Sequence, residues 1–567
     1  MSTSDGGAGG FAPDLIAALA NDLFKGTPAR DVSLTSAPAL PSVSHLPSAG
    51  LPHMQGAPVM YGLPTPLGVP TPNNVPSYPG MPAVTGLPGA PAWPSVSHIP
   101  SAGLPEAQVG QAHVRHADAR HAHVSQPQAA WLEASPRAPE YYFTSITPSV
   151  PHAADARSPL GVSPFSVDAV RRDFPILEER VNGKKLVWLD NAATTHKPQS
   201  VIDRIAYFYA HENSNVHRGA HTLAARSTDA YESARGKVQK FLNAPSPETI
   251  VFTRGTTESI NLVAQSWGRR HLSAGDEIVI TWLEHHSNIV PWQLLCAETG
   301  AKLRVAPVDD KGELLIHEYE RLFNKNTKLV SITHVSNALG TVLPVQELTA
   351  IAHRYGAKVL VDGAQAVSHF PVDVQAIDSD FYVLSGHKLF APTGIGVLYG
   401  KKDVLESMPP WQGGGNMIAD VTFDKTVYNP APSRFEAGTG NIADAVGLGA
   451  AIDYLDRIGL PNAARHEHQL LEYGTARLLE IPRLRLIGTA REKAGVMSFV
   501  IDDVPTEQVG QALAREGIAV RSGHHCAQPA LRRYGLETTV RPSLAFYNTY
   551  DEIDALIDVL KQLQRGW

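Results

Sequence analysis

Polar side chains that could do chemistry follow several short apolar runs of the chain. Lys388 closes the segment Ser385-Gly386-His387-Lys388 after the run FYVL, and Asp362 follows the run AKVLV. Because parallel strands end at one edge of a sheet, we expect both groups at the same edge. A lysine there can form an imine with an aldehyde, and a buried carboxylate suits a protonated ring nitrogen. The alternatives are a solvated lysine and a helix-capping aspartate.

Three further strand ends carry groups that suit the same ligand. Gly255-Thr256-Thr257 opens a helix after TIVFTR, where amides and hydroxyls can hold a phosphate, although a simple capping turn has the same sequence. His285, after DEIVITWLE, can stack on a planar ring and move protons, or form a structural pair with His286. Asn337, after TKLVSITHVS, can donate a hydrogen bond to a ring oxygen. Together, the lysine, the aspartate, the phosphate turn and the histidine specify pyridoxal 5′-phosphate.

A candidate nucleophile and a candidate carboxylate-binding group lie further along. Cys526 sits in RSGHHCAQP beside cationic or titratable neighbours, which favour the thiolate over the unperturbed pKa of about 8.5. Cys296 falls in the helical pattern PWQLLCAETG, so we expect it to pack in the core. Arg541 offers a planar fork for a substrate carboxylate, with a structural ion pair as the alternative.

The frame that must position these groups is a globular region that begins near Ser166. Short Val/Ile/Leu-rich runs alternate there with helical periodicity, which predicts an α/β fold around a mainly parallel sheet. After about residue 430 the pattern changes to helices and a few strands, including AGVMSFVID and GIAVRSG. We therefore predict a large domain over residues 166–430 and a smaller α+β domain over residues 431–567.

The first 165 residues have a different composition. They contain 26 of the 44 prolines and only 15 charged residues, so we predict a disordered extension. Within it, PSVSHLPSAGLP (41–52) returns as PSVSHIPSAGLP (94–105), which is typical of a repeated binding motif or of a duplicated linker. Residues 12–24 could form a short docking helix.

Overall charge and cysteine content exclude several classes of protein. A net charge of −7 gives no general attraction to nucleic acid or to an anionic membrane. Two cysteines cannot build a disulfide framework or a Cys-rich zinc site, and they suit the cytoplasm. No long apolar stretch or secretory signal is present in this sequence, and no metal site is expected.

The ordered motifs LDNAATTHKP, FTRGTTESINLVA, EHHSNIVPWQ, VDGAQA, SGHK, FEAGTGN and RSGHHCAQP resemble those of group II (Suf-type) cysteine desulfurases, which have the fold type I of pyridoxal-phosphate enzymes. The resemblance runs from about Phe174 to the C-terminus and implies a homodimer that converts L-cysteine to L-alanine. It implies an imine at Lys388, with His285 as acid/base and Cys526 as the persulfide-forming nucleophile. The other implied contacts are Asp362 to the ring nitrogen, Gln365 to the ring hydroxyl, Asn337 and Arg541 to substrate, and Thr256, Thr257, Ser385, His387 and a partner subunit's Thr439 to phosphate.

The extension resembles the targeting segments of cysteine desulfurases that are cargo of family 2 encapsulin shells. This implies that residues 1–165 bind a shell protein and that sulfur is mobilised or stored inside that compartment, or passed to iron–sulfur cluster assembly. A sulfur acceptor protein or a thiol reductant must then remove the persulfide. Two alternatives stay open: a selenocysteine lyase, which shares the fold and residues, and a tethered scaffold with a vestigial site.

Overall fold

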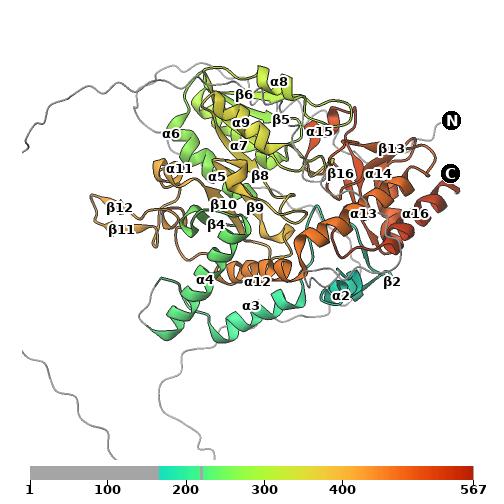
Figure 1. Cartoon of the computed structure of the whole chain (residues 1–567), viewed down its shortest axis with the longest axis horizontal. Helices are drawn as coiled ribbons and strands as arrows, with labels where there is room; N and C mark the ends of the chain where they lie inside the picture. Colours follow the sequence, from blue (N-terminus) through green and yellow to red (C-terminus); the bar gives the residue numbers. More distant parts are fainter. Residues whose placement is uncertain (1–164, 218–220, 566–567) are drawn as a thin grey trace, which may run out of the picture. The chain divides into compact units, whose positions relative to one another are not determined.

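The computed structural model describes residues 165–217 and 221–565 of the chain. The predicted disordered extension, its repeated motif and the predicted helix at residues 12–24 lie outside the described residues, apart from Phe165. Everything below concerns the described part, which Figure 1 shows in colour.

A seven-stranded sheet forms the centre of the fold. Its strands, in spatial order, are β4 (Ile250–Thr253), β10 (Gly396–Gly400), β9 (Phe381–Ser385), β8 (Lys358–Asp362), β7 (Thr327–Thr333), β5 (Glu277–Thr281) and β6 (Lys302–Ala306). Strands β9, β8, β7, β5 and β6 pair in parallel, whereas β10 is antiparallel to both of its neighbours. The predicted α/β class with a mainly parallel sheet is confirmed.

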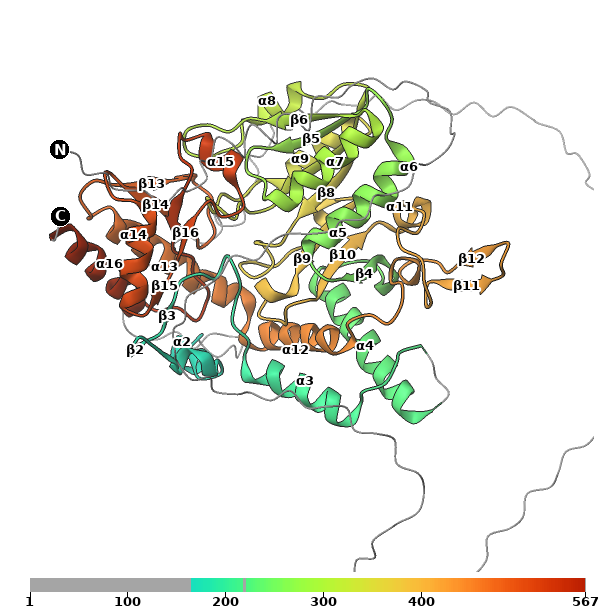
Figure 2. The same ribbon diagram turned by 180° about the vertical axis from the view of Figure 1, so that it is seen from behind.

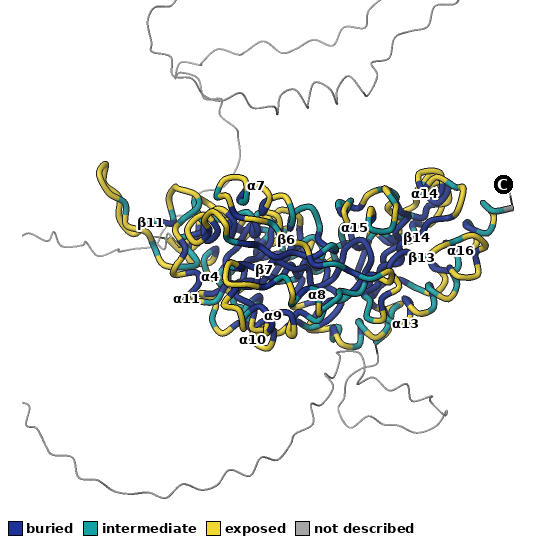
Figure 3. The backbone as a smooth tube through the Cα atoms, turned by 90° about the horizontal axis from the view of Figure 1, so that it is seen from above, coloured by how far each residue is buried: buried dark blue, intermediate teal, exposed yellow. Residues whose placement is uncertain are grey.

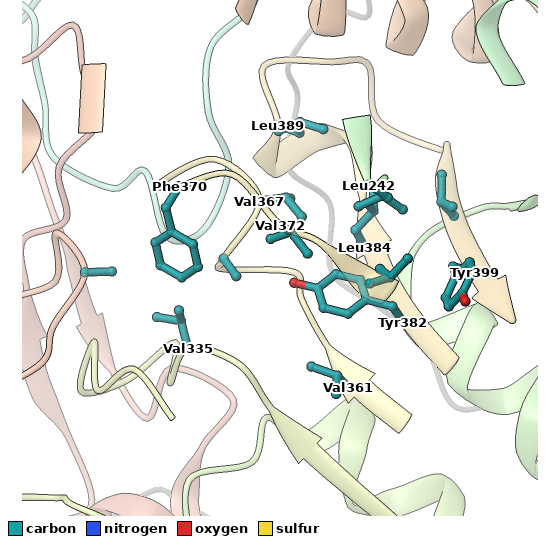
Figure 4. Packing of buried hydrophobic residues seen from close by; sticks show 14 of the residues in the cluster. Leu242, Val335, Val361, Val367, Phe370, Val372, Tyr382, Leu384, Leu389 and Tyr399 are labelled. Carbon is teal, nitrogen blue, oxygen red and sulfur yellow. The ribbon is translucent and has the colours of Figure 1, made fainter. Parts of the chain in front are cut away.

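Successive side chains of each central strand enter two different hydrophobic clusters, one on each face of the sheet. In β5, Ile278 and Ile280 join one cluster and Val279 joins the other. Figure 4 shows part of the second cluster, in which Val361 of β8 and Tyr382 of β9 are labelled. Both faces are therefore covered, which explains why these strands are continuous apolar runs in the sequence. Figure 3 shows the same buried interior along the chain.

Helices cover both faces of the sheet. Residues of α5 (Thr256–Val263), α7 (Val290–Thr299) and α11 (Lys402–Ser407) pack in the cluster that contains Ile278. Residues of α4 (Thr222–Phe241), α9 (Val345–Arg354) and α12 (Ile442–Ile458) pack in the cluster that contains Val279. Helix α12 lies against α3 (Gln199–His211) and α4, as both views show (Figures 1 and 2).

A second, antiparallel sheet lies in the C-terminal part. It has the order β13 (Leu484–Ile487), β14 (Ser498–Ile501), β17 (Thr539–Arg541) and β16 (Arg521–Gly523). Helices α13 (Leu460–Leu478), α14 (Thr506–Arg515) and α16 (Tyr550–Arg565) pack with it around a third hydrophobic cluster. Leu189 belongs to this cluster, because β3 (Val187–Trp188) pairs in parallel with β15 (Ile518–Ala519). An N-terminal segment thus joins the C-terminal sheet region.

Short elements complete the described part. They are the hairpins β1 (Arg180–Val181) with β2 (Lys184–Lys185) and β11 (Ile418–Val421) with β12 (Thr426–Tyr428), and the helices α2 (Val167–Arg171), α6 (Arg269–His271), α8 (Ile316–Arg321), α10 (Val374–Ile377) and α15 (Gln528–Arg532). The turns η1 (Pro175–Glu178), η2 (Pro247–Thr249), η4 (His286–Asn288), η5 (Gly386–Lys388) and η6 (Ser433–Phe435) are 3₁₀-helical, and η3 (Ala264–Gly268) is π-helical. Within residues 165–217 and 221–565, no helix is long and apolar enough to span a bilayer.

Candidate active site

A cavity lies where the carboxyl ends of the parallel strands face β16 and β17. Ten of the twelve site residues predicted from sequence line it: Thr256, Thr257, His285, Asn337, Asp362, Gln365, Ser385, His387, Lys388 and Arg541. The topology explains this gathering, because β5, β7, β8 and β9 all end at the same edge. Cys526 and Thr439 are not among the described residues that line this cavity.

Lys388 and Asp362 form the chemical centre of the cavity. Asp362 ends β8 and is only 4% exposed, and its Oδ1 accepts a hydrogen bond from the Ala364 amide at 2.9 Å. Burial raises the pKa of Asp362, while that amide and Lys388 act in the opposite direction. Burial lowers the pKa of Lys388 to about 8, although the Asp362 carboxylate opposes this shift. About a tenth of Lys388 is therefore a free amine at pH 7, far more than for an ordinary lysine, as attack on an aldehyde requires.

The turn before α5 and the end of β9 build an anion cradle. Gly255 has a φ of +151°, and an added Cβ there would come within 3.2 Å of the Ser385 hydroxyl. That hydroxyl accepts from the Thr256 amide at 2.9 Å and donates to the Thr256 hydroxyl at 2.9 Å. Thr256 and Thr257, the first two residues of α5, line the cavity. Such a helix N-terminus suits a phosphate group.

The His387 ring borders the same cradle in a defined tautomer. The Thr194 hydroxyl donates to the His387 carbonyl at 2.9 Å, so the His387 Nδ1, 3.2 Å from that hydroxyl oxygen, must donate to it. Nε2 is then the unprotonated nitrogen. Burial, followed by the charges of Lys388 and Lys197, lowers the pKa of His387 to about 4. The ring is neutral at physiological pH.

His285 is also held neutral in one tautomer. The Ser287 amide donates to the His285 Nδ1 at 3.0 Å, which leaves the proton on Nε2. Burial, and next the positive charge of Lys388, lower the pKa of His285 to about 3. A neutral ring with an Nε2–H can stack on a flat ligand and donate a hydrogen bond at the same time.

Arg541 and Asn337 provide the polar end of the cavity. Arg541 is 1% exposed, and its guanidinium donates to the Asn337 carbonyl at 2.7 Å and to Asp190 Oδ1 at 3.0 Å. The Asn337 side-chain amide donates to the His525 carbonyl at 2.6 Å. Two buried polar atoms, Arg541 Nε and Asn337 Oδ1, have no hydrogen-bond partner in this protein structure. A buried donor and a buried acceptor that both lack a partner suit a small zwitterionic ligand, which carries a carboxylate and an ammonium group.

Sequence reasoning missed a segment that supports several of these groups. Asp190 pairs with Arg541, the Ala192 carbonyl accepts from the Gln365 side-chain amide at 2.6 Å, and Thr194 fixes His387. Burial raises the pKa of Asp190, and Arg541 acts to lower it. The run VWLDNAATT, in which an acid and small residues follow apolar residues, is the sequence signal that could have identified this segment.

Cys526 lies beside the cavity in the loop after β16. Its amide donates to His524 Nδ1 at 3.0 Å, and its carbonyl accepts from the His286 amide at 2.8 Å. A thiolate at Cys526 acts to raise the pKa of both Lys388 and Arg541, so the sulfur is within electrostatic reach of the cavity. Cys296, expected in the core, is only partly buried on α7 against a core cluster.

Thr439 lies at a different cavity of the same chain. That cavity is lined by Tyr231, Trp411 and Glu436, among others. A third cavity, which also includes Trp411, shares Thr256, Thr257, Ser385 and His387 with the site. His217 lies outside the lining of the first cavity and pairs with Glu232 at 2.9 Å.

The residues present fit pyridoxal 5′-phosphate. An amine with a lowered pKa can take its aldehyde, a buried carboxyl group can face its ring nitrogen, and a neutral histidine can stack on its ring. Any side chain at Gly255 would narrow the anion cradle formed by Thr256, Thr257 and Ser385. A glycine is expected at this position when backbone amides bind an anion.

Comparisons with known proteins agree with this chemistry. Residues 187–556 match the family model for aminotransferase class-V. A cysteine desulfurase of Synechococcus elongatus is 66% identical over 420 residues, which are 74% of this chain and 67% of that protein. A cysteine desulfurase of Escherichia coli O8 is 52% identical over 402 residues, 71% of this chain and 99% of that protein.

A solved structure resembles the fold over a similar range. The crystal structure of the cysteine desulfurase CsdA from Escherichia coli has a TM-score of 0.67 and 40% identity, covering 71% of this chain and 99% of that chain. The fold is therefore that of fold type I pyridoxal-phosphate enzymes. With the family match and relatives covered over most of their length, this chain belongs to the class-V aminotransferase family, as a pyridoxal-phosphate-dependent enzyme of the cysteine desulfurase group.

Proposed function

We propose that the enzyme converts L-cysteine to L-alanine and that Cys526 takes the sulfur as a persulfide. The observation that carries this proposal is geometric: Lys388, His285 and Arg541 line one cavity, and His525, the residue before Cys526, lines it as well. The amine and the carboxylate-binding group thus share one cavity, and the loop that carries the proposed nucleophile borders it.

Each residue has a role in holding the cofactor. Lys388 would hold its aldehyde, Asp362 its ring nitrogen and Gln365 its ring hydroxyl. Thr256, Thr257, Ser385 and His387 would hold its phosphate. When bound, pyridoxal phosphate withdraws electrons from the substrate Cα and so makes its proton acidic.

The remaining residues act on the substrate. Arg541 and Asn337 orient its carboxylate, Arg541 through its unpartnered Nε and Asn337 through the second N–H of the amide that bonds the His525 carbonyl. Lys388, with a pKa of about 8, can accept and return a proton at Cα, and the Nε2–H of His285 can donate a hydrogen bond nearby. The resemblance to group II enzymes implies a partner subunit's Thr439 at the phosphate, so the functional unit we propose is a homodimer.

The sulfur transfer balances without an external oxidant. The Cys526 thiolate attacks the substrate sulfur, a sulfur–sulfur bond forms, and the Cβ–S bond breaks with its electron pair left on Cβ. Cβ then takes a proton. In sum, L-cysteine and an enzyme thiol give L-alanine and an enzyme persulfide. An acceptor protein or a thiol reductant then removes the outer sulfur of the persulfide. The compact RSGHHCAQP loop supports assignment to the group II type.

The decisive experiment compares the two cysteines. Cys526→Ala should keep the visible absorbance of the bound cofactor and release no sulfide from L-cysteine. Cys296→Ala, at a partly buried cysteine of α7 that does not line the cavity, should keep wild-type turnover and serves as the matched control. Sulfide release by Cys526→Ala at the wild-type rate would reject the assignment.

We further propose that residues 1–165 load the enzyme into an encapsulin shell within the cytoplasm. The support is the proline-rich composition and the twelve-residue motif present twice, since two copies on one tether raise the effective concentration at a multivalent shell. Deletion of residues 1–165 should leave an active enzyme that no longer co-purifies with a co-expressed shell protein. Undiminished co-purification would exclude this role.

A further inference from the structure

The loop that carries Cys526 has an uncommon backbone conformation. His525 and Cys526 have φ values of +53° and +55°, in the left-handed region that side-chain-bearing residues seldom adopt. Two such residues in succession persist only where surrounding contacts hold them. The contacts around Cys526 therefore identify what orients the sulfur.

His286 contacts the loop on both sides of Cys526. Its backbone amide donates to the Cys526 carbonyl at 2.8 Å, and its ring Nε2 accepts from the Gln528 amide at 3.3 Å. Since a backbone N–H can only donate, this Nε2 must be unprotonated. His286 belongs to η4, directly after the site residue His285, so it joins the loop to the edge of the seven-stranded sheet.

His524 completes the contacts from within the loop. Its Nδ1 accepts from the Cys526 amide at 3.0 Å, and its ring stacks on that of His286 with centroids 5.8 Å apart and planes 28° apart. Both polar backbone groups of Cys526 are thus bonded to these two histidines. Neither His286 nor His524 is among the described residues that line the cavity, so neither is placed to touch substrate.

We propose that His286 and His524 are positioning residues, a histidine clamp that holds Cys526 in the orientation needed to receive sulfur. The inference rests on the proposed role of Cys526 as nucleophile. The clamp acts through two imidazole nitrogens that accept loop amides, one at Gln528 and one at Cys526. It also joins the loop after β16 to the segment after β5, so the sulfur is placed relative to groups on the other sheet.

Matched substitutions separate the acceptor nitrogen from the ring. His286→Phe and His524→Phe keep a flat ring and remove the acceptor. His286→Gln and His524→Asn restore an oxygen acceptor at the ε and δ positions, respectively. The backbone bond from His286 to Cys526 is present in all four variants, so only the side-chain acceptor changes.

Two measurements on the cofactor-loaded enzyme test the clamp. The first is the rate at which iodoacetamide alkylates Cys526, followed by mass spectrometry with Cys296 of the same molecule as the internal standard. The second is steady-state sulfide release from L-cysteine. Loss of one net hydrogen bond corresponds to about fivefold in an equilibrium, so each Phe variant should raise Cys526 alkylation and lower kcat by about that factor, with KM little changed. The Gln and Asn variants should restore both values.

Several results would overturn the clamp. Wild-type alkylation and kcat in both Phe variants would do so, as would Phe and amide variants that are equally impaired, because then the acceptor is not what matters. His524 is exposed, so its pair of variants decides the question if His286→Phe does not fold. Sulfide release that persists in Cys526→Ala would instead refute the proposed function, while the alkylation rates would still report on the clamp.

Discussion

The reactivity of Lys388 comes from two opposing influences on one amine. Burial disfavours its charge, and the nearby Asp362 carboxylate partly compensates, so its pKa falls to about 8 rather than further. His285 and His387 beside it are neutral for the same reason, with pKa values of about 3 and about 4. The cavity thus holds one amine that can exchange protons near neutral pH among imidazoles that cannot.

Removal of the Asp362 charge should lower the pKa of Lys388 further. We expect Asp362→Asn to shift it downward by about one unit, which is about 1.4 kcal/mol. The pH dependence of reductive methylation of Lys388 in the cofactor-free protein, read by mass spectrometry, measures this shift. An unchanged midpoint would mean that Asp362 carries no charge at that pH.

Arg541 depends on the shape of its guanidinium as well as its charge. A lysine carries its donors on a single nitrogen, whereas Arg541 reaches the Asn337 carbonyl and Asp190 from two nitrogens and keeps a third, Nε, for substrate. Arg541→Lys should therefore raise KM for L-cysteine about 10- to 100-fold. Arg532→Lys, at an exposed arginine paired with Glu537, is the matched control and should leave KM unchanged. Equal KM values in both variants would contradict a carboxylate-binding role for Arg541.

The turn between β4 and α5 is built around the missing side chain of Gly255. Its φ of +151° and the 3.2 Å approach to the Ser385 hydroxyl leave no relaxed place for a Cβ. Gly255→Ala should lower the free energy of unfolding by about 1–2 kcal/mol and weaken pyridoxal phosphate binding about tenfold. Urea unfolding and an absorbance titration measure the two effects.

Gly236→Ala is the control for that substitution. Gly236 lies in α4, and an added Cβ there meets no atom within 4 Å. The change should stabilise the helix by about 0.5–1 kcal/mol and leave cofactor binding alone. If both alanine variants bind cofactor equally, the anion cradle does not need the bare backbone at Gly255.

The sequence predicts the elements around the site better than the contacts between them. Parallel strands end at one edge, so the strand ends predicted that Lys388 and Asp362 would meet, and the structure brings both to one cavity. The antiparallel direction of β10 was not predictable, because a buried strand has the same apolar run in either direction. The contact between Asp190 and Arg541 joins segments 351 residues apart, and no local pattern encodes it. The left-handed φ of Cys526 could not be predicted either, because a non-glycine residue gives no indication of that conformation in the sequence.

The candidate site depends on both sheets of the molecule. Lys388, Asp362 and His285 come from the seven-stranded sheet, whereas Arg541 and the Cys526 loop come from the four-stranded one. Buried titratable groups lie on both sides: His334, 8% exposed, contacts Tyr382 of β9, and His525, 3% exposed, contacts Thr539 of β17. The stability of the whole assembly must therefore respond to pH.

Acid should destabilise the fold through buried neutral histidines. Burial lowers the pKa of His334 to about 3 and that of His525 to about 2, below the unfolded value of about 6.5. The unfolded chain then binds more protons below about pH 6.5, so this contribution is complete above that pH and is lost as pH falls. At about pH 5 each group should cost about 2 kcal/mol. Glu284, whose pKa burial raises to about 8, acts in the opposite direction and reduces the net slope.

A difference between variants isolates one histidine from these opposing effects. Urea unfolding of wild type and His334→Gln at about pH 7.5 and about pH 5 gives two pH-dependent losses of stability. Because the glutamine does not titrate, the loss should be smaller by about 2 kcal/mol in His334→Gln. His317→Gln, at an exposed side chain, should match the wild-type loss. If the His334 variant loses as much stability as wild type, His334 is already free to take up a proton in the folded chain, and its burial against Tyr382 and Phe370 does not hold it neutral.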